Sequence, residues 1–216
     1  MDFAQARHNM VEGQIRTNRV TDAYVVEAME DMPREAFLSD VLKNLAYIDE
    51  DIQVSQGRIM MEPMVLARLL QAAAVEESDV ALVVAAATGY EAAVISKIAS
   101  AVIAVESVDV LFQAASTQLH AEGADTVSMT KGDITTGAPD QGPFDVILVN
   151  GAVEELPSTL ADQLVDGGRL VYVKVAKGTG KAMLVTKTDG VISENELFDA
   201  NVPALPEFAK KPEFSF

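Results

Sequence analysis

Short uninterrupted apolar runs alternate with amphipathic stretches through the last two thirds of the chain. The first run, 80–85, is followed by a helical pattern over 91–100. Runs of this kind are typical of strands buried on both faces of a parallel sheet. Because the alternation repeats, it predicts an α/β fold with a doubly wound, mostly parallel sheet. Further strands are expected at 101–105, 126–130, 144–149, 169–175, 182–188 and 196–202, and further helices at 108–121 and 158–165.

The first 75 residues have a different pattern and are expected to form an N-terminal helical elaboration. Apolar residues recur at helical spacing over 25–32, with Thr21 as a candidate N-cap. Residues 53–64 are expected to be a connector, and 65–74 a second amphipathic helix. The sheet core is expected at 76–216, and the two parts are expected to form one compact unit.

Composition narrows the possible functions. The net charge is −17, with 33 acidic and 16 basic residues, which disfavours nucleic-acid binding. There is no cysteine, so disulfides and thiolate chemistry are excluded. His8 and His120 are not spaced as a metal-binding pair, so no metal site is expected. No secretion signal and no membrane-spanning apolar run is found in the sequence, so a cytoplasmic protein without membrane association is expected.

Candidate chemistry lies where the predicted strands end, because α/β sheets bind ligands beyond the carboxyl ends of their strands. Glu106 could accept hydrogen bonds from both hydroxyls of a ribose, or could be a solvated carboxylate at a strand end. Asp133 could accept from an adenine amino group, or could be a turn residue. The stretch 177–181, Lys-Gly-Thr-Gly-Lys, is expected to be a flexible loop, because it lacks the spacing of a phosphate-binding loop.

Short motifs in a specific order extend over nearly the whole chain. They include Arg7-His8-Asn9-Met10-Val11, Gly13-Gln14-Ile15, Pro33-Arg34-Glu35-Ala36-Phe37, Ala46-Tyr47, Thr88-Gly89-Tyr90, Glu106, Gly132-Asp133, Pro143-Phe144-Asp145 and Gly167-Gly168-Arg169-Leu170-Val171. In order and spacing they resemble the protein-L-isoaspartate (D-aspartate) O-methyltransferase family. The resemblance implies a Rossmann-like methyltransferase fold, with methyl transfer from S-adenosylmethionine to isoaspartyl carboxylates in a protein or peptide.

The resemblance also implies a set of cofactor-binding positions. Glu106 would hold the ribose, Asp133 the adenine, and the backbone around Thr88 and Gly89 the methionine end. Methyl transfer of this kind needs alignment of the two reactants, so no general base is required and no catalytic residue is assigned. The candidate cofactor-binding residues are Ala85, Ala87, Thr88, Gly89, Tyr90, Glu106, Gly132 and Asp133.

The cofactor turn departs from the family pattern. The family turn resembles L-E-I-G-T-G-S-G-Y and falls on 82–90, where Val83 replaces the acid and Ala85 and Ala87 replace two glycines. Each alanine is expected to cost about 1–2 kcal/mol of cofactor-binding free energy if the backbone at that position is left-handed. Val83 also removes a negative partner for the ammonium group of the cofactor, and the lost charge-assisted hydrogen bond is worth about 1.5–3 kcal/mol. The sum, about 4 kcal/mol or more, predicts roughly a thousandfold weaker cofactor binding.

The substrate loop departs as well. The family loop resembles G-Q-T-I-S-Q-P and falls on 57–63, where Met61 replaces the serine expected to contact the substrate carboxylate. Methionine cannot donate a hydrogen bond, and Glu62 adds like-charge repulsion. Arg58 could recapture a carboxylate by a two-pronged contact, or could be a solvent-facing charge. The candidate substrate-binding residues are Gly57, Arg58, Met61, Glu62 and Pro63.

Three functional hypotheses follow from these departures. The chain could be a weak methyltransferase, a binding or regulatory protein that has lost the cofactor, or an enzyme with a different nucleotide-like ligand. The apolar cluster of Met60, Met61 and Met64 could contact a peptide or subunit, or could pack in the core. In each case a protein or peptide is the expected partner.

Overall fold

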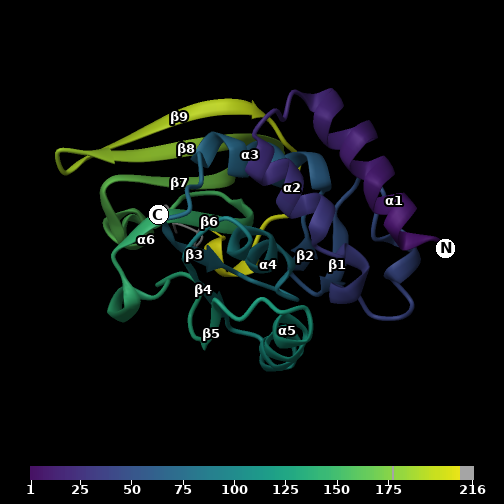
Figure 1. Cartoon of the computed structure of the whole chain (residues 1–216). Coiled ribbons are helices and arrows are strands. Elements are labelled where there is room, and N and C mark those ends of the chain that lie inside the picture. The colour runs from purple at the N-terminus through teal and green to yellow at the C-terminus, as the bar shows by residue number, and fades with distance from the viewer. Residues whose placement is uncertain (177, 210–216) are drawn as a thin grey trace.

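The computed structural model describes residues 1–176 and 178–209. Its centre is a seven-stranded sheet of order β5-β4-β3-β6-β7-β8-β9 (Figure 1). Strands β3 to β7 are parallel, and β8 and β9 are antiparallel additions at one edge. The doubly wound, mostly parallel sheet is therefore confirmed. The strands are β3 Val80–Val84, β4 Ala101–Glu106, β5 Val127–Lys131, β6 Phe144–Val153, β7 Leu164–Ala176, β8 Thr179–Thr188 and β9 Val191–Asp199.

Helices cover the sheet and join its strands. The α-helices are α1 Phe3–Met10, α2 Ala23–Asp31, α3 Pro63–Ala73, α4 Tyr90–Ser96, α5 Asp109–Ala121 and α6 Ser158–Asp162. A π-helical turn η1 spans Val11–Ile15, and the short 3-10 helices are η2 Arg16–Asn18, η3 Arg34–Phe37, η4 Lys43–Leu45, η5 Pro139–Gln141 and η6 Pro206–Phe208. In Figure 1, α1, α2 and α3 lie together on one side, and α5 lies beyond β4 and β5.

The core has two layers because successive strand residues point to opposite faces of the sheet. Ala81 and Val83 belong to the larger layer, which also contains apolar residues of α2, α3 and α4. Leu82 and Val84 belong to the other layer, which contains residues of α6 together with Phe208 of η6. Among residues 1–176 and 178–209, no helix combines the length and apolar character that crossing a bilayer requires.

Several expected local features were wrong. The cap of α2 is Asp22, whose carboxylate accepts from the backbone N–H groups of Tyr24 and Val25; Thr21 lies one residue outside. The connector at 53–64 contains a hairpin of β1 Ile52–Ser55 and β2 Arg58–Met60. Most of the expected flexible loop at 177–181 is strand, because β8 already begins at Thr179; Lys177 lies outside the described residues.

The segment that follows β9 returns to the carboxyl ends of the parallel strands. Ala152 at the end of β6 donates its backbone N–H to the carbonyl of Pro203, and its carbonyl accepts from Leu205. Leu205 covers Gly151, where an added Cβ would lie 2.6 Å from the leucine side chain. Pro206 covers Gly57 in the same way, since a Cβ added to Gly57 would lie 2.7 Å from the proline ring. These two close approaches fix η6 directly over the expected ligand site.

Candidate functional site

The turn between β3 and α4 keeps a backbone that favours glycine. Ala85, Ala87 and Gly89 have φ angles of 60°, 50° and 95°. L-residues other than glycine rarely adopt such angles, because Cβ approaches the following carbonyl. Ala85 and Ala87, the two positions where the family pattern is expected to carry glycine, therefore both have left-handed backbone. Both are fully buried, as is the adjoining Tyr90.

Glu106 lies beside this turn at the end of β4 and is fully buried. One carboxylate oxygen accepts from the backbone N–H of Ala87 at 2.9 Å. The other accepts from the N–H groups of Ser107 and Val108 at 2.8 and 2.9 Å. The solvated strand-end alternative for this residue is therefore wrong.

Arg58 supplies the charge that opposes Glu106. Its side chain is 1% exposed, and its Nε lies 3.1 and 3.0 Å from the two oxygens of Glu106. The solvent-facing alternative for Arg58 is therefore wrong. The arginine does form a two-pronged carboxylate contact, through Nη1 and Nη2, but its partner is Glu207 of the same chain.

Glu207 of η6 completes the network from the opposite side. Its two carboxylate oxygens accept from Nη2 and Nη1 of Arg58 at 2.8 and 3.2 Å. Burial opposes the charge of the guanidinium, but hydrogen bonds to Glu207 and Glu106 outweigh it and raise the pKa of Arg58. Burial likewise tends to raise the pKa of Glu207, yet Arg58 holds it below its ordinary value. The remaining N–H groups of Arg58 donate to the Gly57 carbonyl and the Ser107 hydroxyl.

This arrangement does not fit a ribose on Glu106. A carboxylate has about four lone-pair sites. In Glu106 these face three backbone N–H groups and the Nε of Arg58, which lies near both oxygens. No acceptor capacity is left for two ribose hydroxyls. In this conformation Glu106 therefore does not fit the ribose of an adenosyl cofactor.

The other expected cofactor residues lie close by. Thr88 has a buried hydroxyl without a hydrogen-bond partner in the described structure. Gly132 donates its N–H to the carbonyl of Glu106. Asp133 is exposed and accepts from the N–H and hydroxyl of Thr135, so it forms the turn that was the alternative prediction. Its negative charge acts on Glu207, which places it at the edge of the same site.

The expected substrate loop is built into the core rather than open. Met61 is fully buried, donates its N–H to Glu91 at 3.0 Å, and accepts from Arg34 at 2.6 Å. Met60 is also fully buried, so core packing is confirmed for these two methionines. Pro63 begins α3 at a position where its missing N–H costs nothing.

Glu62 differs from its buried neighbours because it borders an open groove. Its backbone N–H donates to Asp51, and both residues line the groove together with Glu50. Burial, followed by repulsion from Asp49, Asp51 and Glu50, raises the pKa of Glu62 to about 7. This acidic surface repels carboxylates, so it opposes binding of an isoaspartyl group.

Sequence reasoning missed three residues of the site. Glu207 carried no motif, and only its contact with Arg58 gives it a role. Ser107 follows Glu106 directly but was not singled out. Glu91 follows the turn motif, is fully buried, and has one carboxylate oxygen without a partner in the described structure. A charged residue inside the otherwise apolar start of α4 was the available signal for Glu91.

Comparison with known proteins decides the family. Residues 5–204 match the family model described as protein-L-isoaspartate(D-aspartate) O-methyltransferase. The chain belongs to this family. Protein-L-isoaspartate O-methyltransferase 2 of Anaeromyxobacter sp. is 37% identical over 183 residues, covering 84% of this chain and 75% of the relative. Protein-L-isoaspartate O-methyltransferase of Methylorubrum extorquens is 39% identical over 183 residues, covering 85% and 79%.

Solved structures agree with the isoaspartyl methyltransferase assignment at the level of the fold. A putative protein-L-isoaspartate O-methyltransferase from Plasmodium falciparum superimposes with a TM-score of 0.81 at 22% identity, over 93% of this chain and 98% of its own. That protein was crystallised with S-adenosyl-L-homocysteine. The Rossmann-like methyltransferase fold and the recognition of the family from sequence motifs are therefore confirmed.

Proposed function

We propose that this member of the isoaspartyl methyltransferase family acts as a binding or regulatory protein whose adenosyl site is closed by its own side chains. The observation that supports the proposal is the saturated carboxylate of Glu106. Its ligands are Arg58 and three backbone N–H groups. The family's methyl transfer from S-adenosylmethionine to isoaspartyl carboxylates is then weak or absent here.

Energetics favour the closed state over cofactor binding. Removing one partner from a buried ion pair costs about 3–5 kcal/mol. A nucleoside must therefore displace a strong internal ligand before it reaches Glu106. Val83 is fully buried and offers no negative charge to the ammonium group of a bound cofactor. The acidic groove at Glu62 disfavours the acceptor carboxylate as well.

Calorimetric titration with S-adenosylhomocysteine tests the proposal. We expect no detectable heat from the unmodified protein at high ligand concentration. Arg58→Ala should bind the ligand more tightly than the unmodified protein does, because it frees Glu106. Arg16→Ala is the matched control, since Arg16 forms only an exposed pair with Glu12. Micromolar binding by the unmodified protein would contradict the closed-site proposal, and an Arg58→Ala protein without any gain would show that Arg58 is not the obstacle.

Retained methyl transfer is the second candidate, and the backbone of the turn favours it. Ala85 and Ala87 keep left-handed φ angles, so the shape of the family turn persists. In this alternative Arg58 and η6 would move away before S-adenosylmethionine binds. A methyl-transfer assay on an isoaspartyl peptide distinguishes the two candidates: turnover comparable to that of an active relative supports the second, and its absence supports the first.

A further inference from the structure

The guanidinium groups of two arginines have no hydrogen-bond acceptor among residues 1–176 and 178–209. The sequence contains seven arginines. Five have partners in the protein. Arg7 donates to the Tyr47 hydroxyl and forms an ion pair with Glu35, and the side chains of Arg16, Arg34, Arg58 and Arg169 donate to carboxylate or carbonyl oxygens. The two exceptions, Arg19 and Arg68, line the same groove. In a chain with 33 acidic residues, two arginines on one groove have no carboxylate paired with their side chains in the part of the chain that the structure describes.

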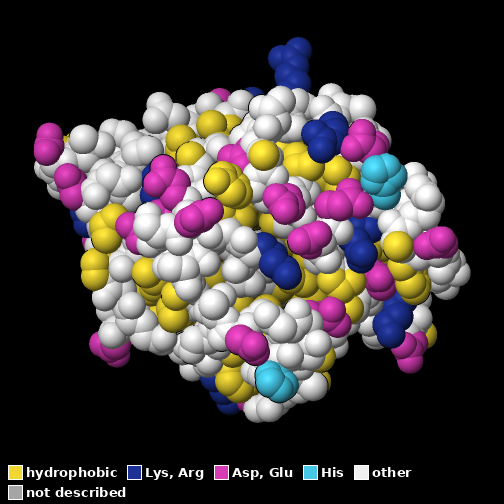
Figure 2. Space-filling model, in the orientation of Figure 1, with side chains coloured by type: hydrophobic (Ala, Val, Ile, Leu, Met, Phe, Trp, Pro, Cys, Tyr) yellow, Lys and Arg dark blue, Asp and Glu magenta, His cyan; other side chains and the backbone are white. Residues whose placement is uncertain are grey.

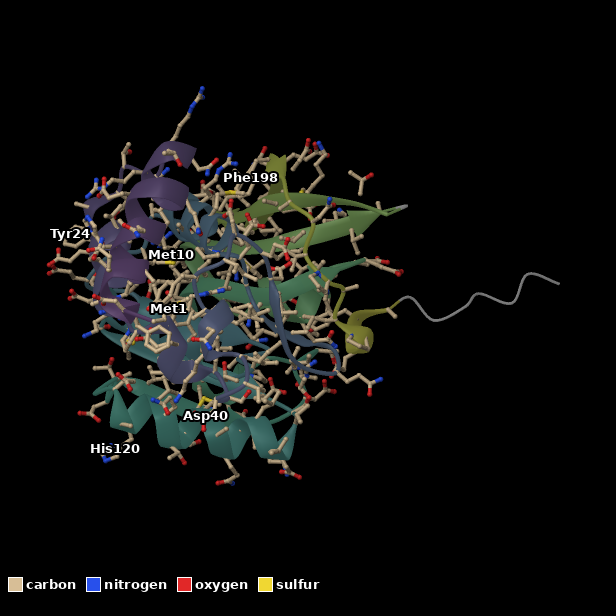
Figure 3. All side chains as sticks on the ribbon, turned by 90° about the vertical axis from the view of Figure 1, so that its right-hand side faces the viewer. Met1, Met10, Tyr24, Asp40, His120 and Phe198 are labelled. Atoms are coloured by element: carbon tan, nitrogen blue, oxygen red, sulfur yellow. The ribbon has the colours of Figure 1, made fainter. Side chains whose placement is uncertain are left out.

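The groove lies between η2, α3 and the end of β9, away from the Arg58 network. Its volume is about 340 Å³, and its lining also includes Asn18, Gln71, Leu197 and Phe198. Figure 3 shows Phe198 where the end of β9 meets the helical side of the molecule. The walls therefore combine apolar surface with two positive charges.

Arg68 is held in place by Phe198. Its guanidinium carbon lies 3.6 Å from the centre of the phenylalanine ring, a cation–π contact. Stacking uses the face of the guanidinium and leaves the N–H groups on its edge available as donors. A planar fork of this kind binds two oxygens of one anion.

Arg19 is positioned through its backbone. It has a φ of 65°, a left-handed conformation that is unfavourable for a residue other than glycine. The side-chain amide of Gln71 donates to the Arg19 carbonyl at 3.2 Å. The oxygen of the same amide accepts from the N–H groups of Thr21 and Asp22 at 2.7 and 3.0 Å. Gln71 of α3 thus fastens the Arg19 turn beside Arg68.

We propose that Arg19 and Arg68 form a binding site for a phosphate monoester. A dianion balances two guanidinium groups, whereas a carboxylate neutralises only one. A phosphate also offers three oxygens, enough for both arginine forks. Phe198 and Leu197 suit an apolar or aromatic carrier of the phosphate. The inference does not depend on the state of the adenosyl site.

Calorimetric titration with inorganic phosphate and with a short phosphoserine peptide tests this site. We expect both to bind, and acetate to bind much more weakly. Arg19→Gln and Arg68→Gln should each weaken phosphate binding about tenfold or more, since each removes a charge-assisted interaction. Arg68→Lys should bind phosphate more tightly than Arg68→Gln and less tightly than the unmodified protein. Lysine keeps the positive charge but lacks the planar guanidinium that contacts two oxygens. Arg16→Gln is the matched control and should bind as the unmodified protein does.

Two outcomes would overturn the proposal. One is the absence of heat with either phosphate probe at millimolar concentration. The other is equal binding by the unmodified protein and an Arg19→Gln, Arg68→Gln double variant whose thermal unfolding remains cooperative. Tighter binding of the phosphopeptide than of inorganic phosphate would assign the site to a phosphorylated protein, and the reverse to a small phosphate ester; either supports the site.

Discussion

Ala85 and Ala87 occupy backbone conformations in which glycine is more stable. Their φ angles of 60° and 50° persist because the surrounding core fixes the turn. Ala86 between them has no positive φ, although it is equally buried. Strain at single residues therefore marks where the family glycines stood.

Replacing both alanines by glycine should relieve this strain. We expect Ala85→Gly with Ala87→Gly to raise the free energy of unfolding by about 1–2 kcal/mol, as the relieved strain exceeds the entropy gained by the unfolded chain. Urea denaturation measures the change. Ala86→Gly is the matched control and should destabilise by about 0.5–1 kcal/mol. A double variant less stable than the unmodified protein would show that the turn is not strained.

Glu91 gives the stability a pH dependence. Burial is the main cause that raises the pKa of its carboxyl group from the ordinary value of 4.5 to about 7. Between these two values the folded state binds more protons than the unfolded state, so stability falls as pH rises from 4.5 towards 7. A pKa shift of this size lowers the free energy of unfolding above pH 7 by about 3 kcal/mol at most, relative to its value below pH 4.5.

Glu91→Gln should remove that contribution. The amide oxygen can still accept from the N–H of Met61, which now donates to the carboxylate at 3.0 Å. We expect the variant to be more stable than the unmodified protein at pH 8 and similar to it at pH 5. Chemical denaturation at both pH values checks this. An equal change at the two pH values would contradict the assignment to Glu91.

At the scale of elements, the segment after β9 closes the expected ligand site. Leu205, Pro206 and Glu207 each contact a different part of it: Gly151, Gly57 and Arg58. Two of these contacts depend on a glycine, because a Cβ would collide with the segment. The helix η6 is therefore specified by small residues far away in the sequence.

Gly151→Ala should displace this segment. The added Cβ would lie 2.6 Å from Leu205, and the φ of 148° is already unfavourable for alanine. We expect a loss of about 2–3 kcal/mol in the free energy of unfolding, measured by urea denaturation. Gly123→Ala is the control: its φ is 68°, but nothing lies within 4 Å of the added atom, so only strain of about 1 kcal/mol is expected. Equal losses in the two variants would indicate that Leu205 yields without cost.

At the scale of the whole molecule, the alternation of apolar runs predicted the sheet because parallel strands buried on both faces carry an unambiguous pattern. The β1–β2 hairpin was missed because β2 is three residues long and contains a buried arginine, Arg58. Composition cannot show that such a charge is paired with residues 48 and 149 positions away. The candidate cofactor residues were found by motif, but their closure by Glu207 depends on tertiary contacts.

On the face drawn in Figure 2, charged side chains are spread widely. Figure 2 shows acidic side chains scattered across the visible face with few basic ones between them. The net charge of −17 repels anions at long range, yet screening at physiological salt limits this to about 8 Å. A local pair of arginines can therefore act independently of the overall field.

The Arg58 network also has a consequence for biosynthesis. A ribosome extends the chain from its N-terminus at about 5–20 residues per second. Arg58 and Glu106 are both made before Glu207, which lies 149 residues after Arg58. In the nascent chain the guanidinium has one of its two carboxylate partners, and Pro206 does not yet cover Gly57. The carboxyl end of the sheet is thus sealed only after residue 207 has emerged, so small molecules can reach it for the first seconds of the protein's existence.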